Sequence, residues 1–122
     1  MEFRDNKAIY LQIAEYVCEH ILLEKWQADQ KIPSVREMAV MLEVNPNTVM
    51  RTYELLQNKN IISNKRGIGF FVAEEAVANV KSYRKAQFIE DELPMVFRNI
   101  YLLNIDFEEL QTRYNTFVKE NF

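Results

Sequence analysis

The chain has 122 residues, 48% of them hydrophobic and 27% charged, and its formal net charge at pH 7 is -3. This length fits one small domain with a short appendage, and the hydrophobic fraction is ample for a core. No uninterrupted apolar run approaches the roughly 18 residues that cross a bilayer, and the polar N-terminus lacks the apolar segment of a signal peptide. A lone cysteine excludes an intrachain disulfide framework and suits a reducing cytosol. From these features together, we expect a cytoplasmic protein with no membrane contact.

The charge is unevenly distributed along the chain. Residues 31–72 contain six Lys or Arg and three Glu, which gives this segment a charge of +3. From residue 74 onward, six Lys or Arg face nine Asp or Glu, which leaves the C-terminal part at -3. Because nucleic acid binds a local cationic face rather than the sum of all charges, residues 31–72 are the candidate nucleic-acid surface.

The first predicted element is an amphipathic helix over about residues 9–24. Its apolar stripe repeats every four residues, at Ile9, Ile13, Val17 and Ile21. Residues 23–31 follow without a regular pattern, and we expect Trp26 within them to fill the core beneath a loop.

Two short helices joined by a tight turn are predicted next. Ser34 and Glu37 form a capping box, in which each side chain binds the other residue's free backbone N–H. The helix that they begin points apolar residues inward, at Met38, Ala39 and Leu42. Residues 43–45 form the turn, where a glycine in place of Glu43 would turn more comfortably. Two helices connected this tightly predict a helix-turn-helix.

The second of these helices, over residues 46–58, opens with Asn45 as a favoured N-cap and Pro46 at the first helical position. Its apolar face consists of Val49, Tyr53 and Leu56, and its other side carries Asn47, Met50, Arg51 and Glu54. A helix with a buried back and amide and guanidinium groups at its front fits a DNA major groove. The alternative is an ordinary amphipathic helix with a good cap.

A β-hairpin with a basic tip follows directly. Residues 61–64 and 70–73 are rich in β-forming residues, and Lys65 and Arg66 lie between them. The chain's only two glycines, Gly67 and Gly69, are also here, where they permit backbone conformations with positive φ. A basic hairpin after a helix-turn-helix predicts a wing, and the alternative is a plain solvated turn.

The remainder of the chain, from residue 75, is predicted to be helical. Pro94 predicts a kink or helix boundary near residues 91–94, and Asp106 is expected to cap the last helix with Glu109 as its box partner. The apolar residues here are too few to enclose a separate core, so we expect burial against a second copy. The predicted dimer interface is Leu93, Val96, Phe97, Ile100, Leu103, Phe107, Leu110, Tyr114 and Phe117. The alternative is that these helices fold back on the first helix.

Four stretches carry motifs that span roughly residues 5–73. They are Tyr10-Leu11-Gln12-Ile13-Ala14, Ile32-Pro33-Ser34-Val35-Arg36-Glu37-Met38-Ala39, Val44-Asn45-Pro46-Asn47-Thr48-Val49 and Arg66-Gly67-Ile68-Gly69-Phe70-Phe71-Val72. In this order and spacing they resemble the GntR family of bacterial transcriptional regulators, and the Asn-Pro-Asn-Thr-Val form and short helical tail resemble its YtrA-type branch. The resemblance implies a winged helix-turn-helix DNA-binding domain at residues 1–73 and a helical dimerisation region at 74–122. It also implies sequence-specific binding to a palindromic double-stranded DNA operator as a homodimer, usually as a repressor.

The resemblance also implies which residues contact DNA. The matching positions are Arg36, Asn45, Asn47 and Thr48, and Gly67 matches the wing-tip glycine that enters the minor groove. With the neighbouring polar and basic residues, the predicted DNA-binding set is Ser34, Arg36, Asn45, Asn47, Thr48, Arg51, Lys65, Arg66 and Gly67. The chain departs from the family pattern at Met50 and Ile68, where many relatives carry polar or basic residues. Asp29 and Asn60 replace the usual turn glycines, and both residue types tolerate positive φ.

No enzyme is expected from this sequence. It holds no nucleophile–base set, no metal-spaced cluster and no phosphate-cradling loop, and Cys18 and His20 lie on different faces of a helix. We therefore expect no cofactor and no metal site. The alternative function is a winged-helix protein–protein interaction module without a DNA target, whose binding would depend little on salt. Whether a small-molecule effector binds is left open by the sequence. Its candidate site is a cleft at the dimer interface near Trp26 or Tyr83.

Overall fold

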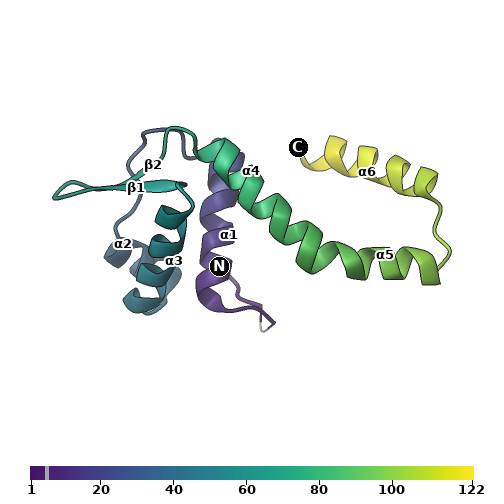
Figure 1. Ribbon diagram of the computed structural model, residues 1–122, viewed down its shortest axis with the longest axis horizontal. Helices are drawn as coiled ribbons and strands as arrows, with labels where there is room; N and C mark the ends of the chain where they lie inside the picture. The colour runs from purple at the N-terminus through teal and green to yellow at the C-terminus, as the bar shows by residue number, and fades with distance from the viewer. Residues whose placement is uncertain (5) are drawn as a thin grey trace. The chain divides into compact units, whose positions relative to one another are not determined.

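The computed structural model describes residues 1–4 and 6–122, which form two compact units, Met1–Arg84 and Lys85–Phe122 (Figure 1). The first unit contains α1 (Ile9–Leu22), α2 (Val35–Leu42), α3 (Pro46–Asn58), β1 (Ile62–Lys65), β2 (Gly69–Val72) and most of α4 (Ala76–Gln87). The second contains the π-helical turn η1 (Phe88–Glu92), α5 (Leu93–Leu102) and α6 (Phe107–Asn121). The predicted fold class is confirmed: the chain is mainly helical, with a small hairpin in a winged helix-turn-helix arrangement. Among the described residues, no helix has the length and apolarity that crossing a membrane requires.

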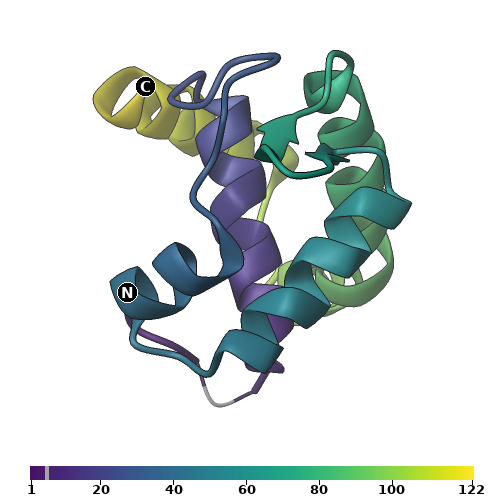
Figure 2. The ribbon, with the colours of Figure 1, turned by 90° about the vertical axis from the view of Figure 1, so that its left-hand side faces the viewer.

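The core of the first unit lies between the apolar faces of α1, α2 and α3 and is closed by the hairpin and α4. Figure 2 shows α2 and α3 in front of α1. The buried apolar residues are Ile13, Ala14, Val17, Cys18, Ile21, Ile32, Met38, Ala39, Leu42, Val49, Tyr53, Leu56, Ile61, Ile62, Val72, Ala76 and Val80. The last two belong to α4, so a DNA-binding segment that ended at residue 73 would lack part of this core. The division of function at residue 73 stays a prediction.

Helix α1 begins at residue 9, as predicted, but the burial of Ile9 and the end of the helix differ from the prediction. Ile9 was expected in the apolar stripe, but it begins the helix and is 44% exposed. The helix ends at Leu22 rather than residue 24, because Glu24 takes a left-handed conformation with φ 60°. Trp26 is half-buried and packs against the core as predicted, with its ring 4.9 Å from that of His20.

The sheet has one more edge contact than the sequence predicted. Its two strands pair antiparallel, with Ile62 opposite Val72. Each strand is shifted by one residue toward the hairpin tip: β1 covers 62–65 where 61–64 was predicted, and β2 covers 69–72 where 70–73 was predicted. The segment before Pro33, predicted to be irregular, runs along the other edge of β2. There the Ile32 N–H donates to the Phe70 carbonyl at 2.9 Å, and the Val72 N–H donates to the Gln30 carbonyl at 2.9 Å. Backbone pairing satisfies groups that burial would otherwise leave unpaired.

At several turns, residues other than glycine take the left-handed backbone conformation. Glu43 closes α2 with φ 56° and ψ 48°, which confirms that the helix-turn-helix turn needs the conformation glycine takes most easily. Asp29 and Asn60 have φ of 64° and 57°, so the two residues that replace turn glycines adopt the expected backbone.

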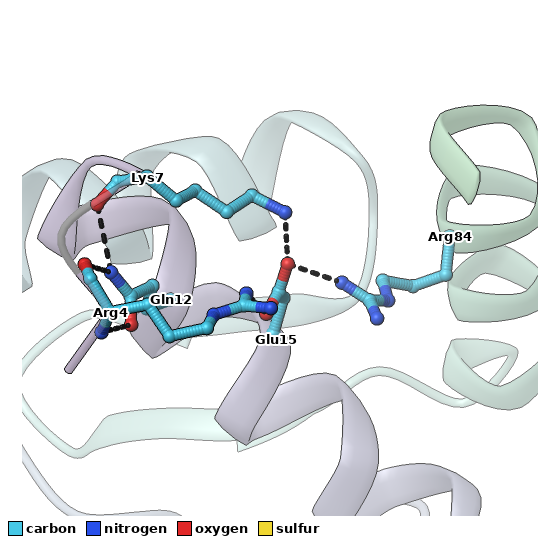
Figure 3. A network of polar contacts seen from close by, with 5 residues as sticks. All are labelled: Arg4, Lys7, Gln12, Glu15 and Arg84. Carbon is cyan, nitrogen blue, oxygen red and sulfur yellow. Dashed lines mark hydrogen bonds and ion pairs between the residues drawn. The ribbon is translucent and has the colours of Figure 1, made fainter. Parts of the chain in front are cut away.

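A polar cluster fastens the N-terminal arm and α4 to α1 (Figure 3). Gln12, buried in α1, accepts from the Arg4 backbone N–H at 2.7 Å and donates to the Arg4 and Lys7 carbonyls at 2.7 and 2.8 Å. Glu15 pairs with Lys7, with Arg4 at 2.9 Å and with Arg84 of α4 at 3.0 Å. Burial alone would raise the pKa of Glu15, but the hydrogen bonds and positive charges of Lys7 and Arg84 outweigh it and lower that pKa.

This cluster predicts acid-sensitive stability. Because the folded pKa of Glu15 lies below its ordinary value of 4.5, its stabilising contribution is present above the unfolded pKa and is lost as pH falls through the folded pKa. We expect Glu15→Gln to be less stable than wild type at neutral pH and to lose less stability between about pH 6 and pH 3. Urea unfolding across this range measures both slopes. Glu19→Gln, an exposed change on the same helix, should keep the wild-type slope; equal slopes in all three proteins would contradict the assignment.

The second unit contains a helix boundary at the predicted place. A π-helical turn ends at Glu92, and Pro94 lies in the first turn of α5, where its missing N–H costs no hydrogen bond. The predicted capping box at α6 is wrong: Asp106 stands at the N-cap without a side-chain cap hydrogen bond. Glu109 instead accepts from the Arg113 guanidinium at 3.0 Å, one helical turn on. This i,i+4 ion pair engages the Glu109 carboxylate, which the box would have needed as the acceptor for the Asp106 backbone N–H.

Candidate nucleic-acid interface

The helix-turn-helix and the hairpin lie on the same side of α1. Both ribbon views place α2, α3 and the β1–β2 hairpin there (Figures 1 and 2). These elements fall within residues 31–72, the segment with a charge of +3. The predicted site residues therefore come from three neighbouring elements of one unit.

The start of α2 presents a guanidinium beside a closed capping box. The Glu37 N–H donates to Ser34 Oγ at 3.1 Å, and the Ser34 N–H donates to Glu37 Oε1 at 2.9 Å, as predicted. The backbone and side-chain hydrogen bonds of Ser34 lower the pKa of Glu37. Arg36 follows in the first turn with an exposed side chain. Since this box uses Ser34 Oγ as an acceptor, its hydroxyl hydrogen is left to donate outward.

The start of α3 is equally well defined. Asn45 Oδ1 accepts from the Asn47 backbone N–H at 2.8 Å, and Pro46 occupies the first turn, as predicted. The capping role uses the carbonyl oxygen of the Asn45 amide. Asn47 is exposed and Thr48 half-buried, so Asn47 is the amide that projects from the helix start.

Arg51 is held by a residue that sequence reasoning did not assign to the site. Its guanidinium carbon lies 3.8 Å from the centre of the Tyr10 ring on α1. Thr52, the next residue, donates its hydroxyl to the Tyr10 carbonyl at 2.7 Å. Tyr10 belongs to the predicted first helix, and no local pattern in the sequence signals a partner so distant. The stack places Arg51 on the flank of α3 that faces α1.

The buried side of α3 locks the three elements together through Tyr53. Its ring is fully buried and packs edge-on against Phe70 of β2, with centroids 4.8 Å apart. Its hydroxyl donates to the Pro33 carbonyl at 2.6 Å, just before α2. Burial of the hydroxyl raises the pKa of Tyr53, so the group stays a protonated donor.

The hairpin tip is a tight turn whose residues are exposed to solvent. The Ile68 N–H donates to the Lys65 carbonyl at 2.9 Å, and Gly67 between them has φ 79° with open space where a Cβ would stand. Gly69 has φ 139°, and a Cβ there would lie 2.9 Å from Lys31 Cε. Arg66 is exposed, and the Lys65 ammonium lies 4.2 Å from the centre of the Phe71 ring. The turn can bring backbone and cationic side chains close to a ligand surface.

The first unit has further features that the predicted DNA-binding set does not include. A hollow of about 320 Å³ is lined by Trp26, Glu24, Glu74 and neighbouring apolar residues. Cys18 is fully buried, and burial raises the pKa of its thiol to about 12, which fits the expected packing role. Within the described ranges, no group of three or more His, Cys, Asp or Glu side chains could hold a metal ion.

Comparisons with known proteins point to one family. The family model "Bacterial regulatory proteins, gntR family" matches residues 9–72, more than half of the chain. The Bacillus subtilis HTH-type transcriptional regulator YhcF is 33% identical over 118 residues, which cover 97% of this chain and 96% of YhcF. The HTH-type transcriptional repressor YtrA of B. subtilis is 31% identical, over 88% of this chain and 82% of YtrA. The crystal structure of a GntR-family regulator from Bacteroides thetaiotaomicron shares 48% identity with a TM-score of 0.72, covering 94% of this chain and 100% of that one.

Proposed function

Because this chain belongs to the GntR family of bacterial transcriptional regulators, which carry a DNA-binding helix-turn-helix, we propose that it binds a palindromic double-stranded DNA operator as a homodimer. We propose that binding represses transcription, since YtrA, a transcriptional repressor by name, is similar over 88% of the chain. The observation that carries the proposal is the cationic segment 31–72, whose exposed polar residues come from α2, α3 and the hairpin on one side of α1. The family is one of transcriptional regulators rather than enzymes.

In this proposal α3 enters the major groove. Asn47 makes paired hydrogen bonds to an adenine edge, and Arg51 reaches a guanine edge or a phosphate. Arg36 approaches a phosphate from the start of α2, and the hydroxyl hydrogen of Ser34 can donate to the same backbone. The free N–H groups at the starts of both helices add phosphate contacts, favoured by the positive end of each helix. The capping contact between Asn45 and Asn47 supports this role, since it presents the helix start in one geometry.

The hairpin contributes contacts to the minor groove in the same proposal. The absence of a side chain at Gly67 lets the turn approach closely, and Lys65 and Arg66 lie along the phosphates. Phosphate contacts set affinity and register, and the base contacts from α3 set sequence preference. Binding should therefore weaken steeply as salt rises.

The apolar surface of the second unit is the proposed dimer interface. None of the described residues of η1, α5 and α6 is buried, and the exposed fractions of Leu103, Phe107 and Tyr114 are 69%, 67% and 66%. Part of this surface is a hollow of about 630 Å³ between the end of α5 and the start of α6. A twofold pair of chains presents two copies of α3 to two half-sites, which one chain cannot read. Each specific contact between a side chain and a base contributes only about 1–3 kcal/mol, so the contacts in one half-site are too few to specify a unique operator.

The arginine contacts give the test of DNA binding. We expect Arg36→Ala and Arg66→Ala each to weaken binding to a selected operator by about tenfold, with melting temperatures near wild type because both side chains are exposed. Fluorescence anisotropy across a salt series measures the affinity and its salt slope, which should fall by about one for each lost phosphate contact.

Arg98→Ala is the matched control, since this arginine is exposed on α5 and belongs to neither the predicted DNA-binding set nor the predicted dimer interface. It should leave affinity and salt slope unchanged. Wild-type affinity in both test variants would contradict the DNA-binding surface. Partner binding with little salt dependence, and no operator from selection on random duplexes, would favour the protein–protein interaction module instead.

A further inference from the structure

The exposed face of α3 carries one side chain without a strong hydrogen-bonding group. Asn47, Met50, Arg51 and Glu54 are all exposed and recur at spacings of three and four residues, so they share one face. Met50 is 44% exposed, whereas Val49 beside it is fully buried. The thioether of methionine is only a weak hydrogen-bond acceptor, so Met50 cannot form the strong hydrogen bonds that the polar side chains on this face can form.

The neighbours of Met50 define the flank on which it lies. Arg51 stacks on Tyr10 and marks the flank toward α1. Tyr53, one turn after Met50, bonds to the Pro33 carbonyl and marks the flank toward α2. Residues three apart on a helix are neighbours, so Met50 projects on the α2 side of the exposed face. The Met50 side chain therefore lies away from the stack of Arg51 on Tyr10.

We propose that Met50 determines operator sequence by contacting the methyl group of a thymine, next to the base pair that Asn47 contacts; this rests on the proposed DNA-binding function. The thymine methyl is the apolar group that base pairs display in the major groove. The flexible, unbranched side chain of methionine adapts to such a contact, and it offers a cytosine amine no partner.

The spacing along α3 fixes where this thymine lies. Three residues advance about 4.5 Å along a helix, and successive base pairs are about 3.4 Å apart. Asn47 and Met50 therefore reach neighbouring base pairs when α3 follows the groove. An adenine contacted by Asn47 and a thymine contacted by Met50 give two consecutive A·T or T·A pairs in each half-site.

The experiment starts from duplexes selected by the full chain from a random pool. Each thymine of the selected operator is then replaced by deoxyuridine, which removes only the methyl group and keeps base pairing. We expect one thymine per half-site whose replacement weakens wild-type binding about fourfold, the value for one buried methyl group. The same replacement should leave the affinity of Met50→Ala unchanged. Met41→Ala, which alters a 55% exposed methionine on α2, should respond to deoxyuridine as the wild type does.

The outcomes separate this inference from the function on which it rests. Selection that enriches no sequence contradicts sequence-specific DNA binding itself. An enriched operator in which no thymine replacement distinguishes wild type from Met50→Ala supports DNA binding and overturns the role of Met50. Met50→Ala should fold normally because the side chain is exposed, and circular dichroism checks this before binding is compared.

Discussion

Replacing Tyr53 with alanine is expected to remove about 3–5 kcal/mol from the free energy of unfolding of the first unit. The ring is fully buried against Phe70, and the hydroxyl donates to the Pro33 carbonyl. The substitution therefore leaves a cavity and an unpaired carbonyl at the point where α2, α3 and β2 meet. Single domains are stable by only about 5–15 kcal/mol, so a loss of this size should abolish operator binding at elevated temperature.

Two further variants divide this loss into its parts. Tyr53→Phe keeps the ring and removes the hydrogen bond, so about 0.5–1.5 kcal/mol should be lost. Val40→Ala shortens a side chain that is 79% exposed on α2 of the same unit and should change stability by less than about 1 kcal/mol. Urea unfolding followed by circular dichroism measures all three. Similar losses in Tyr53→Ala and Val40→Ala would show that the core does not depend on Tyr53.

Introducing charge into the proposed dimer interface is expected to produce a monomer that binds the operator about 10²-fold to 10⁴-fold more weakly. The variant is the full chain with Phe97→Asp and Ile100→Asp, both on α5, where Phe97 is 51% exposed. Two carboxylates that lose water at an apolar interface oppose association strongly. The loss of DNA affinity follows because the second half-site contact ceases to be intramolecular.

Sedimentation and operator binding are measured on the same samples. Asn99→Asp adds a carboxylate to the same helix outside the predicted interface and should stay dimeric. A double variant that still sediments as a dimer would place the interface elsewhere. A monomeric variant with undiminished affinity would mean that pairing does not contribute to operator recognition.

Local signals in the sequence predicted the helix starts well. The capping box of Ser34 and Glu37 and the cap by Asn45 need only residues within three positions, and the structure confirms both. The same pattern at Asp106 failed: the Asp106 side chain makes no cap hydrogen bond, and the Glu109 carboxylate pairs with Arg113 one turn away. A local motif does not show which other partner its acidic side chain will meet once the helix has formed.

Contacts between distant segments were the ones that the sequence did not predict. The stack of Arg51 on Tyr10, the pairing of residues 29–32 with β2 and the convergence on Glu15 each join elements that are far apart in the chain. None of them leaves a periodic signature, since one side chain or a short extended segment suffices. The family resemblance placed the motifs in register, but it did not identify these supports.

The burial of Cys18 has a practical consequence for spectroscopy. This is the chain's only cysteine, and burial raises the pKa of its thiol to about 12, so almost none of it is the reactive thiolate at neutral pH. A cysteine introduced at the exposed Ile68 could therefore be labelled with a maleimide dye in the otherwise unaltered protein. Fluorophores could be attached selectively to the hairpin tip, without first removing the native thiol.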